Sequence, residues 1–496
     1  MRLKKFSWLA LMTILALVIS SCGGGGGGQP AGQPTAAPGA EATAAPEPTA
    51  EGAAPEPTAA VEFAQEAQPN QKTIVWMVRS GQEENPWERD VVLPAYQKAK
   101  PDVFVKVVNI NQDDIAVKRE AMIAAKEPLH VWSTNWGGDG FASDRYRGLI
   151  TDLTPLIERD KLDLSDFLPD VLAIYQSEGK QWGIPFLTTG SYIYYNKKIF
   201  DDAGIAYPPT DWDDASWTWD AYVDLAKKLT KNYDDPNTAI YGANTAFLNL
   251  EGPPMLWGQF VWPEDAYKTG FADKVTVTDE KSIMAFQKFH DLVYVDKVAP
   301  DPSASQALDQ LGGAFQTGRL AMVMSGGWGH WAFKSLINDP NGFCWGVAPM
   351  PMGSPDAKIR TVIYTDPWVI TAGMDQENTD MAWDFVKFLT SKEQQAAYTN
   401  ATGTPPVRSS LLADYYKQYE KCMPADQMKQ VFEGAFTHGR ESSNHLIVKW
   451  DELNQIWGNL LDPFWTDPEG KAADVLPQVE QQTNDALQRI KQESGR

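Results

Sequence analysis

Histidine and cysteine are scarce in this sequence, and their scarcity limits the chemistry available to it. Among 496 residues there are five histidines and three cysteines. No histidine has the spacing of a metal ligand, and no glycine-rich loop ends in Lys-Ser/Thr as a phosphate-binding loop does. We therefore expect no metal and no cofactor, and neither a zinc enzyme nor an ATPase.

Positive charge is also in short supply. The formal net charge is −22, from 43 basic and 65 acidic residues. This balance argues against nucleic acid, or an anionic membrane surface, as the ligand. After the amino terminus no stretch is long and apolar enough to cross a membrane, so the chain is not itself expected to be a channel or permease.

The amino terminus has the pattern of a secretion signal. Basic residues precede an apolar run, residues 9–19, that is too short to span a bilayer stably, and we assign residues 1–21 to a signal peptide. The sequence ISSC that ends at Cys22 resembles the lipobox of bacterial lipoproteins. This resemblance implies cleavage before Cys22 and lipidation of its thiol; the alternative is an ordinary secretory signal with an incidental cysteine.

Residues 22–70 contain Gly, Pro, Ala, Glu and Thr in a proportion that cannot build a core. Such a composition is expected to stay disordered. A flexible coil of this length averages roughly 40 Å from end to end. The sequence therefore predicts a tether, held at the outer face of a bacterial cytoplasmic membrane by the lipid anchor only; a neutral spacer is the alternative.

Residues 71–496 are long enough for two or three domains, and they alternate between strand and helix patterns. Strands are predicted at 73–78, 103–108 and 129–132, with helical stretches between them. In a parallel α/β sheet, ligands bind beyond the carboxyl ends of the strands. The loops that follow the first and third strands are therefore the first candidates for a binding site.

A second α/β section follows Gly190. Apolar spacing predicts helices near residues 218–230, 283–293 and 381–393, with Thr218 as an N-cap. A strand at 320–324 opens into a glycine-rich loop. Cys344 and Cys422 form either one disulfide or two buried thiols.

Several segments, in this order and spacing, resemble the family 1 extracellular solute-binding proteins of ABC importers, the maltose-binding-protein-like group. They are TIVWMV, RGLITDLTPLIERD, GKQWGIPFLTTGSYIYYNKKIFDDAGI, WTWDAYVDLAKKLT, AFQTGRLAMVMSGGW and NATGTPPVRSS. The resemblance covers nearly all of residues 72–496.

This resemblance implies an α/β, two-lobed type II periplasmic-binding-protein fold with hinge crossovers. One lobe would combine residues 72–186 with 368–405, and the other 187–367 with 406–496. The chain would be a monomeric binding protein, not an enzyme, that delivers a sugar or oligosaccharide to the transmembrane subunits of an ABC permease and their ATPase. Hinge closure around a ligand is a known mode of switching in such proteins.

A sugar presents C–H faces that aromatic rings can cover and hydroxyls that need fixed partners. Trp328 matches the stacking tryptophan of the family. The other predicted ligand-binding residues follow strands, lie at the crossover, or line segments facing the expected cleft; they are Arg79, Glu83, Glu84, Asn135, Trp136, Tyr192, Glu251, Trp257, Asp366 and Trp450. Trp450 lies at helical spacing from Trp457, so core packing is its alternative.

Two rival functions remain open from the sequence. A secreted glycoside hydrolase would need two carboxylates facing each other across a cleft, and no motif singles out such a pair. A surface adhesin without a transport role would have no small-molecule ligand. An importer whose ligand is a polyol, glycerol phosphate or an oligopeptide also stays open. The scarcity of Lys and Arg in the candidate loops makes a phosphorylated ligand the poorer match.

Overall fold

The computed structural model describes residue 63 and residues 66–81, 84–245 and 249–495. Residues 59–496 form one compact unit, in which helices and strands begin at Lys72. The expected signal peptide, Cys22 and Glu83 lie outside the described residues. Within the described ranges, no helix has both the length and the apolar character needed to span a bilayer.

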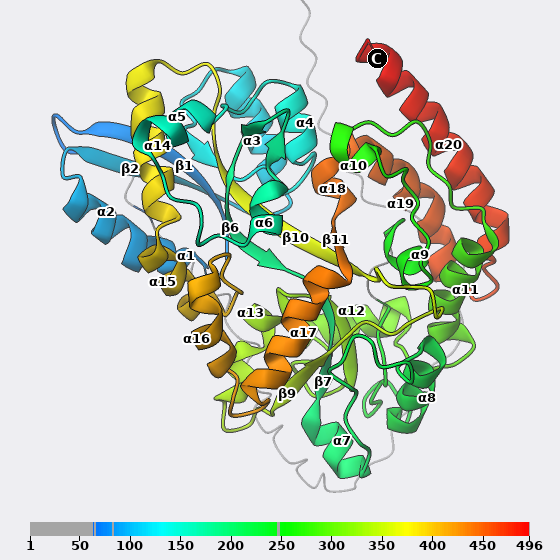
Figure 1. Cartoon of the computed structure of the whole chain (residues 1–496). Coiled ribbons are helices and arrows are strands. Elements are labelled where there is room, and N and C mark those ends of the chain that lie inside the picture. Colours follow the sequence, from blue (N-terminus) through cyan, green and yellow to red (C-terminus); the bar gives the residue numbers. More distant parts are fainter. Residues whose placement is uncertain (1–62, 64–65, 82–83, 246–248, 496) are drawn as a thin grey trace, which may run out of the picture. The chain divides into compact units, whose positions relative to one another are not determined.

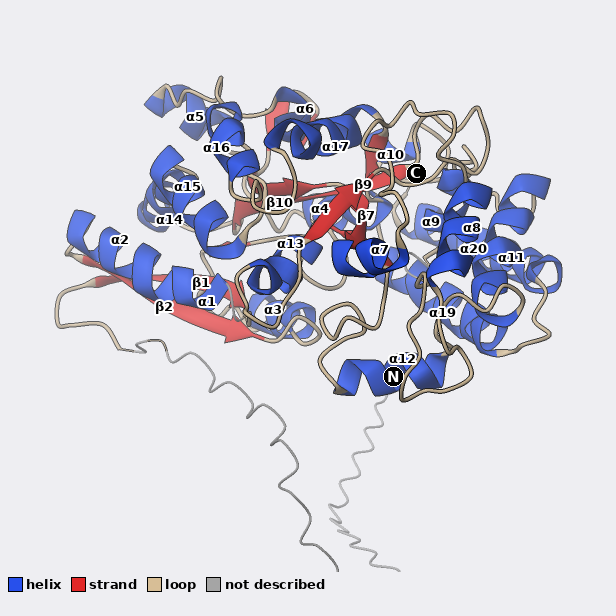
Figure 2. Ribbon diagram, turned by 90° about the horizontal axis from the view of Figure 1, so that it is seen from below, coloured by secondary structure: helices blue, strands red, loops and turns tan. Residues whose placement is uncertain are grey.

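A mixed sheet of six strands contains the three strands predicted first (Figure 1). Strand β1 (Lys72–Arg79) pairs in parallel with β2 (Val103–Ile110) along its whole length, and with β3 (Val131–Trp132) at Trp76. The predicted alternation of strand and helix is confirmed here. Helices α2 (Leu93–Ala99) and α3 (Ile115–Ala124) lie on opposite sides of the β1–β2 pair (Figure 2).

Strand β10 (Thr361–Ile370) joins this sheet to the rest of the unit. Its carboxyl end pairs antiparallel with β3, its middle pairs antiparallel with β6 (Ile184–Thr189), and its first three residues pair in parallel with β11 (Gly439–Glu441). The register with β6 shifts between Asp366 and Pro367. Such an irregularity bends a strand and redirects its side chains.

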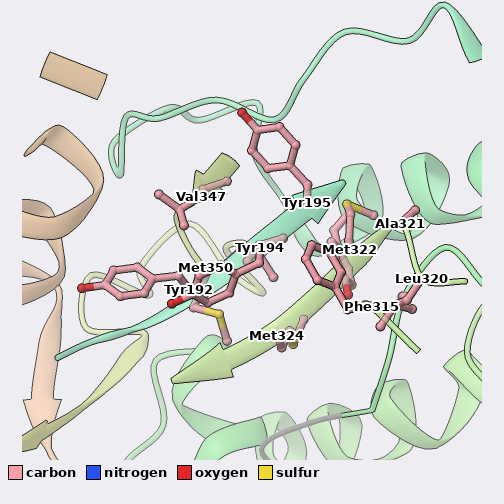
Figure 3. Close-up of a cluster of buried hydrophobic side chains, with 14 of the residues drawn as sticks. Tyr192, Tyr194, Tyr195, Phe315, Leu320, Ala321, Met322, Met324, Val347 and Met350 are labelled. Atoms are coloured by element: carbon pink, nitrogen blue, oxygen red, sulfur yellow. The ribbon is translucent and has the colours of Figure 1, made fainter. Parts of the chain in front are cut away.

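A second sheet has three antiparallel strands. Strand β7 (Ser191–Asn196) lies between β8 (Met322–Gly326) and β9 (Trp345–Ala348). All six residues of β7 are buried, and Figure 3 shows Tyr192 and Tyr194 among the methionines of this cluster. The strand predicted at 320–324 begins two residues later, at Met322.

Helices cover both sheets. Thr218 accepts a hydrogen bond from Ala221 N at 3.2 Å, which confirms it as the N-cap of α8. The helices before β8 are α1 (Glu84–Trp87), α4 (Phe141–Tyr146), α5 (Thr154–Asp160), α6 (Pro169–Ala173), α7 (Lys197–Ala203), α8 (Trp219–Leu229), α9 (Gly252–Leu256), α10 (Ala266–Thr269), α11 (Glu280–Tyr294) and α12 (Pro302–Gln310). Those after it are α13 (Gly329–Lys334), α14 (Gln376–Leu389), α15 (Lys392–Thr402), α16 (Leu412–Lys417), α17 (Ala425–Thr437), α18 (Ser443–Leu446), α19 (Trp450–Thr466) and α20 (Ala472–Glu493).

The short elements complete the chain. A π-helical turn, η1 (Glu88–Val92), joins α1 to α2, so the single helix predicted between the first two strands is interrupted. Two 3-10 turns and a two-stranded hairpin complete the set: η2 (Ser335–Ile337), η3 (Ser409–Leu411), β4 (Gln176–Ser177) and β5 (Lys180–Gln181).

The buried apolar side chains form three clusters. The first core draws on residues 63–187 and 368–407. The second core draws on residues 192–350 and 415–435, and the third on residues 250–286 and 447–490. Each core combines stretches from distant parts of the sequence, so the chain passes between the cores more than once.

A disulfide joins Cys344 to Cys422. The structure therefore decides between the two alternatives that the sequence left open. The bond ties the residue just before β9 to the loop after α16, across 78 residues of sequence. Disulfides persist in oxidising compartments outside the cytoplasm.

The last residues of the expected tether differ from the prediction. Phe63 is only 9% exposed and belongs to the first core. Gln68 and Gln71 close a turn, with Gln71 N donating to Gln68 O at 3.1 Å. A composition that cannot build a core by itself can still supply one apolar side chain to a core built by other residues.

The burial of Asp144, in α4, predicts that the stability of the fold depends on pH. It is 0% exposed and neither of its carboxylate oxygens has a hydrogen bond to a described residue; Arg119 Nη2 lies 3.9 Å away. Burial raises its pKa to about 7, and the nearby Arg119 opposes the shift. The folded state then binds a proton that the unfolded state has already lost, so stability should fall as pH rises from about 4 to about 7.

We expect Asp144→Asn to remove this contribution, which is on the order of 4 kcal/mol over that range. Urea unfolding at pH 5 and pH 7.5 would measure it. Asp414→Asn, at a side chain that is 84% exposed, is the matched control and should keep the wild-type slope. An unchanged slope in Asp144→Asn would contradict the proposed burial of a neutral carboxyl group.

Candidate functional site

Many of the predicted ligand-binding residues meet where β1 and β3 end beside β10. Arg79 is the last residue of β1, and Asn135 and Trp136 follow β3. Asp366 lies at the register shift of β10. The carboxyl ends of parallel strands meet at one edge of a sheet, and the crossing strand brings a carboxylate to that edge.

Arg79 is enclosed by aromatic rings. Its guanidinium carbon lies 5.0 Å from the ring centre of Trp136 and 4.9 Å from that of Trp331. Its edge donates two hydrogen bonds to Glu84, both at 2.7 Å. Glu84 also accepts a hydrogen bond from Tyr398 Oη at 2.8 Å. Arg79 therefore joins the first strand to the helix that follows the glycine-rich loop.

The charge of Arg79 is well stabilised in this position. Burial opposes the charged form, but the carboxylate of Glu84 outweighs it and raises the pKa of Arg79 above its usual range. The guanidinium lies within 5.0 Å of two aromatic ring centres, and the two hydrogen bonds to Glu84 add to these contacts. These contacts give Arg79 and Glu84 a positioning role in this conformation.

Asn135 uses its whole side chain to hold the crossover. Its amide nitrogen donates to Thr365 O at 2.6 Å and to Tyr175 Oη at 2.8 Å. Its oxygen accepts from Phe141 N at 3.3 Å. Tyr175 Oη also donates to the same carbonyl of Thr365. The side chain of Asn135 thus fixes the loop after β3 to the backbone of β10.

Trp136 makes the neighbouring contact. Its indole nitrogen donates to Asp366 Oδ2 at 2.9 Å, and its ring packs edge-on against Phe186 and Trp368. Both Trp136 and Asp366 are buried. The predicted residues Asn135, Trp136 and Asp366 are therefore brought together, as parts of one latch between loop and crossover strand.

Trp328 differs from the other predicted tryptophans because its ring is 39% exposed. Its ring centre lies 5.0 Å from that of Tyr364, in an edge-on arrangement. Two glycines allow this placement. A Cβ at Gly326 would lie 2.1 Å from the Trp328 ring, and one at Gly327 would lie 1.5 Å from Thr189 Oγ1.

A polar cluster next to Tyr364 was not predicted. Glu441 Oε1 contacts His445 Nδ1 at 2.5 Å and accepts from Thr365 N at 3.0 Å. Its other oxygen is buried and has no hydrogen-bond partner among the described residues, and the same holds for Ser443 Oγ. The Tyr364 ring centre lies 6.0 Å from that of His445. Burial raises the pKa of Glu441.

Glu251 lies in the same region but faces the backbone of the β11–α18 segment. It accepts hydrogen bonds from Ser443 N at 3.1 Å and Ser442 Oγ at 3.2 Å. Burial raises its pKa, although these serine donors oppose the shift. Glu251 thus fixes the segment that presents Glu441.

Three predicted ligand-binding residues are buried in cores. Tyr192 packs against Phe432 and Tyr194 in the second core, and Trp257 packs against Trp219. Trp450 packs against Trp457, with ring centres 4.6 Å apart, in the third core. In this conformation their rings stabilise the fold and offer no face to a ligand.

The arginines around the site already have carboxylate partners. Arg440 Nη2 donates to Glu264 at 2.5 Å, and its guanidinium carbon lies 4.5 Å from the ring centres of both Phe260 and Tyr267. Arg79 is bound to Glu84 and His445 to Glu441. Within the described ranges, no cluster of His, Cys, Asp and Glu is arranged to hold a metal ion.

The exposed indole of Trp328, the half-buried ring of Tyr364 and the buried carboxylate of Glu441 thus lie along β10 and its partner strand β11.

Residues 92–425, more than half of the chain, match the family described as bacterial extracellular solute-binding protein. The chain belongs to this family. The prediction made from the sequence is confirmed at the level of the family.

Relatives of this solute-binding protein are distant. A binding protein of Brucella abortus (strain 2308) is 25% identical over 56% of this chain and 59% of its own length. The diacetylchitobiose binding protein DasA of Streptomyces coelicolor is 24% identical over 68% of this chain and 74% of its own. The chain thus spans less than two thirds of the Brucella relative.

The fold is shown by a solved structure. An ABC substrate-binding protein of Listeria monocytogenes in complex with cycloalternan has a TM-score of 0.68 and 20% identity, covering 84% of this chain and 99% of that one. The chain therefore has the two-lobed periplasmic-binding-protein fold, as predicted.

Three residues near the site were not predicted, because their sequence patterns are weak: Trp331, Glu441 and His445. Trp331 follows Trp328 by three residues, which puts both near one face of the turn that starts α13. Glu441 and His445 have an i, i+4 spacing in a polar stretch between two helices. Neither spacing is unusual enough to be chosen without the long-range pairing of β10 with β11.

We expect Gly327→Ala to disturb the Trp328 loop and the fold. The new Cβ would overlap Thr189, so the loop must shift, at a cost of about 1–3 kcal/mol. Thermal unfolding would measure this loss. Gly458→Ala, in α19 with open space around its Cβ position, is the matched control and should be neutral or slightly stabilising. A Gly327→Ala protein as stable as wild type would contradict the close approach.

Proposed function

We propose that this chain is the substrate-binding lipoprotein of an ABC importer, and that it captures a sugar or oligosaccharide for a membrane permease. The ligand would lie between a lobe of residues 72–186 and 368–405 and a lobe of residues 187–367 and 406–496. Membership of the solute-binding family supports this function. The limits of the first core, residues 63–187 and 368–407, agree with the first lobe within a few residues, apart from Phe63 ahead of it.

The exposed ring of Trp328 is the observation that carries the proposal. A large apolar ring left 39% exposed beside polar groups is a suitable platform for the C–H face of a sugar. The free oxygen of Glu441 and the hydroxyl of Ser443 supply partners for hydroxyl groups close to Tyr364. We infer that Trp328, Tyr364 and Glu441 contact the ligand, and that Asn135, Trp136 and Asp366 hold the adjoining hinge.

A neutral ligand suits the site better than an anionic one. Arg79 and Arg440 are each paired with a glutamate, and His445 is bound to Glu441. A phosphorylated ligand that recruited Arg79 would have to break its pair with Glu84 and leave that buried carboxylate unpaired, which costs several kcal/mol. Two relatives are named for carbohydrates, diacetylchitobiose and cycloalternan, and another for sn-glycerol 3-phosphate.

The proposed location is outside the cytoplasm. The Cys344–Cys422 disulfide is typical of an oxidising compartment. The extracellular solute-binding family agrees with this location. We propose that the lipid on Cys22 is the membrane attachment and that the protein acts as a monomer, as a receptor and not an enzyme.

Trp328→Ala should weaken binding of the best ligand in a panel of neutral oligosaccharides by about 2–4 kcal/mol, as truncation of a buried aromatic anchor does. Stability should change less, because the ring is already partly exposed. Trp328→Phe should recover part of the affinity, since it keeps a flat apolar face. Calorimetry on the same preparations used for thermal unfolding separates the two effects.

Tyr207→Ala is the matched control, because Tyr207 is 41% exposed and packs against Tyr195 and Phe200, near α7. It should leave affinity unchanged. Glycerol 3-phosphate in the panel tests the charge argument, and mass spectrometry of the recovered sugar tests for hydrolysis. Unchanged affinity in a folded Trp328→Ala protein would remove Trp328 from the site.

Cys22→Ala should release the protein from the membrane fraction. The reason is that the thiol of Cys22 is the expected attachment point of the acyl chains, and two or more chains are needed for stable anchoring. Immunoblots of membrane and soluble fractions would measure the release, with Ser21→Ala as the control that keeps a small residue before the cysteine. Retention of Cys22→Ala on the membrane would contradict the lipid anchor.

A further inference from the structure

One face of the β1–β2 pair is open and apolar. Side chains alternate along strands, so Thr73 and Val75 of β1 share a face with their partners Phe104 and Lys106 of β2. These residues line a groove of about 1200 Å³, which is bordered by Met122 of α3. Phe104 is only half-buried in it. The groove lies at the start of the parallel strands, away from the candidate site.

The chain ahead of β1 lies along this groove. Lys72 N donates to Asp102 O at 2.9 Å, and the Gln71 side chain donates to Pro101 O at 2.9 Å. Gln68 N donates in turn to the side-chain oxygen of Gln71 at 2.8 Å, which closes a turn. Ala67 then lines the groove itself. The segment is therefore fixed to the edge of the sheet before the first strand begins.

Phe63 gives this segment an apolar anchor. It is the only aromatic residue between Cys22 and Asn70, in a stretch dominated by Gly, Pro, Ala, Glu and Thr. It is 9% exposed and belongs to the same core as Val75, Met122 and Leu129, which line the groove. A lone phenylalanine in a tether needs a surface that buries it, and the open face of β1–β2 is such a surface.

We propose that the groove on the β1–β2 face is a docking site for the chain's own tether, with Phe63 and residues 66–71 as its occupant. The free tether then ends at Phe63 instead of at Lys72. The tether therefore enters the folded unit at Phe63, and this contact, not the first strand alone, sets the point of attachment. The groove is a built-in peptide-binding site that serves the anchor and is separate from the ligand site.

Thermolysin, which cleaves before large apolar residues, tests the contact in the full chain purified in detergent. We expect the bond before Phe63 to be cleaved at least tenfold more slowly than in a synthetic peptide of residues 52–70. Cleavage is followed by mass spectrometry of the released fragments. An equal rate in chain and peptide would overturn the proposal.

Substitutions in the groove make the test specific. Phe104→Ser should raise the cleavage rate towards that of the peptide, whereas Val117→Ser, at a residue of α3 that is 73% exposed and outside the groove, should not. If Phe104→Ser unfolds, hydrogen exchange provides the second measurement. Phe63→Ser should then speed amide exchange in β2, and Phe63→Leu should restore it.

A second copy of the chain is the competing occupant, and sedimentation distinguishes it. A monomer at all concentrations, with Phe63 protected, supports the proposal. A concentration-dependent dimer in which protection of Phe63 is lost on dilution would overturn it, because the groove would then be filled from another molecule. Both outcomes can be read whether or not the chain binds a sugar.

Discussion

Strand β10 is the constraint on which the rest of the structure depends, because its ten residues must satisfy three neighbouring strands at once. Its start pairs with β11, its middle with β6, and its end with β3. The register with β6 shifts between Asp366 and Pro367, in the middle of that pairing. Asn135 and Trp136 hold the strand beside this irregularity, because they donate hydrogen bonds to Thr365 and Asp366.

Around β10, polar and charged side chains form pairs, and aromatic rings pack beside these pairs. The Arg79–Glu84 pair lies between Trp136 and Trp331, and the Glu441–His445 pair lies beside Tyr364. Breaking a buried pair is far more costly than never forming it. A ligand that binds through uncharged hydroxyl groups would leave these pairs intact, whereas a strongly charged ligand would compete with them. These paired charges are the basis for proposing a polar, uncharged ligand.

The sequence predicted the elements better than the side-chain roles. Alternation of strand and helix, the Thr218 cap and the apolar faces of α8 and α14 are local patterns, and they are confirmed. The roles of Trp136 and Asn135 depend on partners 230 residues away, which no local pattern reveals. Trp257, Trp450 and Tyr192 were predicted to contact a ligand, as Trp328 was, but they are buried. The exposure of an aromatic ring depends on neighbouring side chains that come from other segments. Glu441 and His445 were missed because each lies in a very short element, Glu441 in the three-residue strand β11 and His445 in the four-residue helix α18.

The position of β1 also has a mechanical consequence. Gln71 and Lys72 are clipped to Pro101 and Asp102, while Arg79 lies at the other end of an eight-residue strand, roughly 25 Å away at the usual rise per residue. A pull along the chain ahead of Lys72 enters the folded unit through the evenly spaced ladder between β1 and β2. Those bonds share the load in shear, so a pull transmitted to β1 would be spread over the strand pair before it reached Arg79 at the far end.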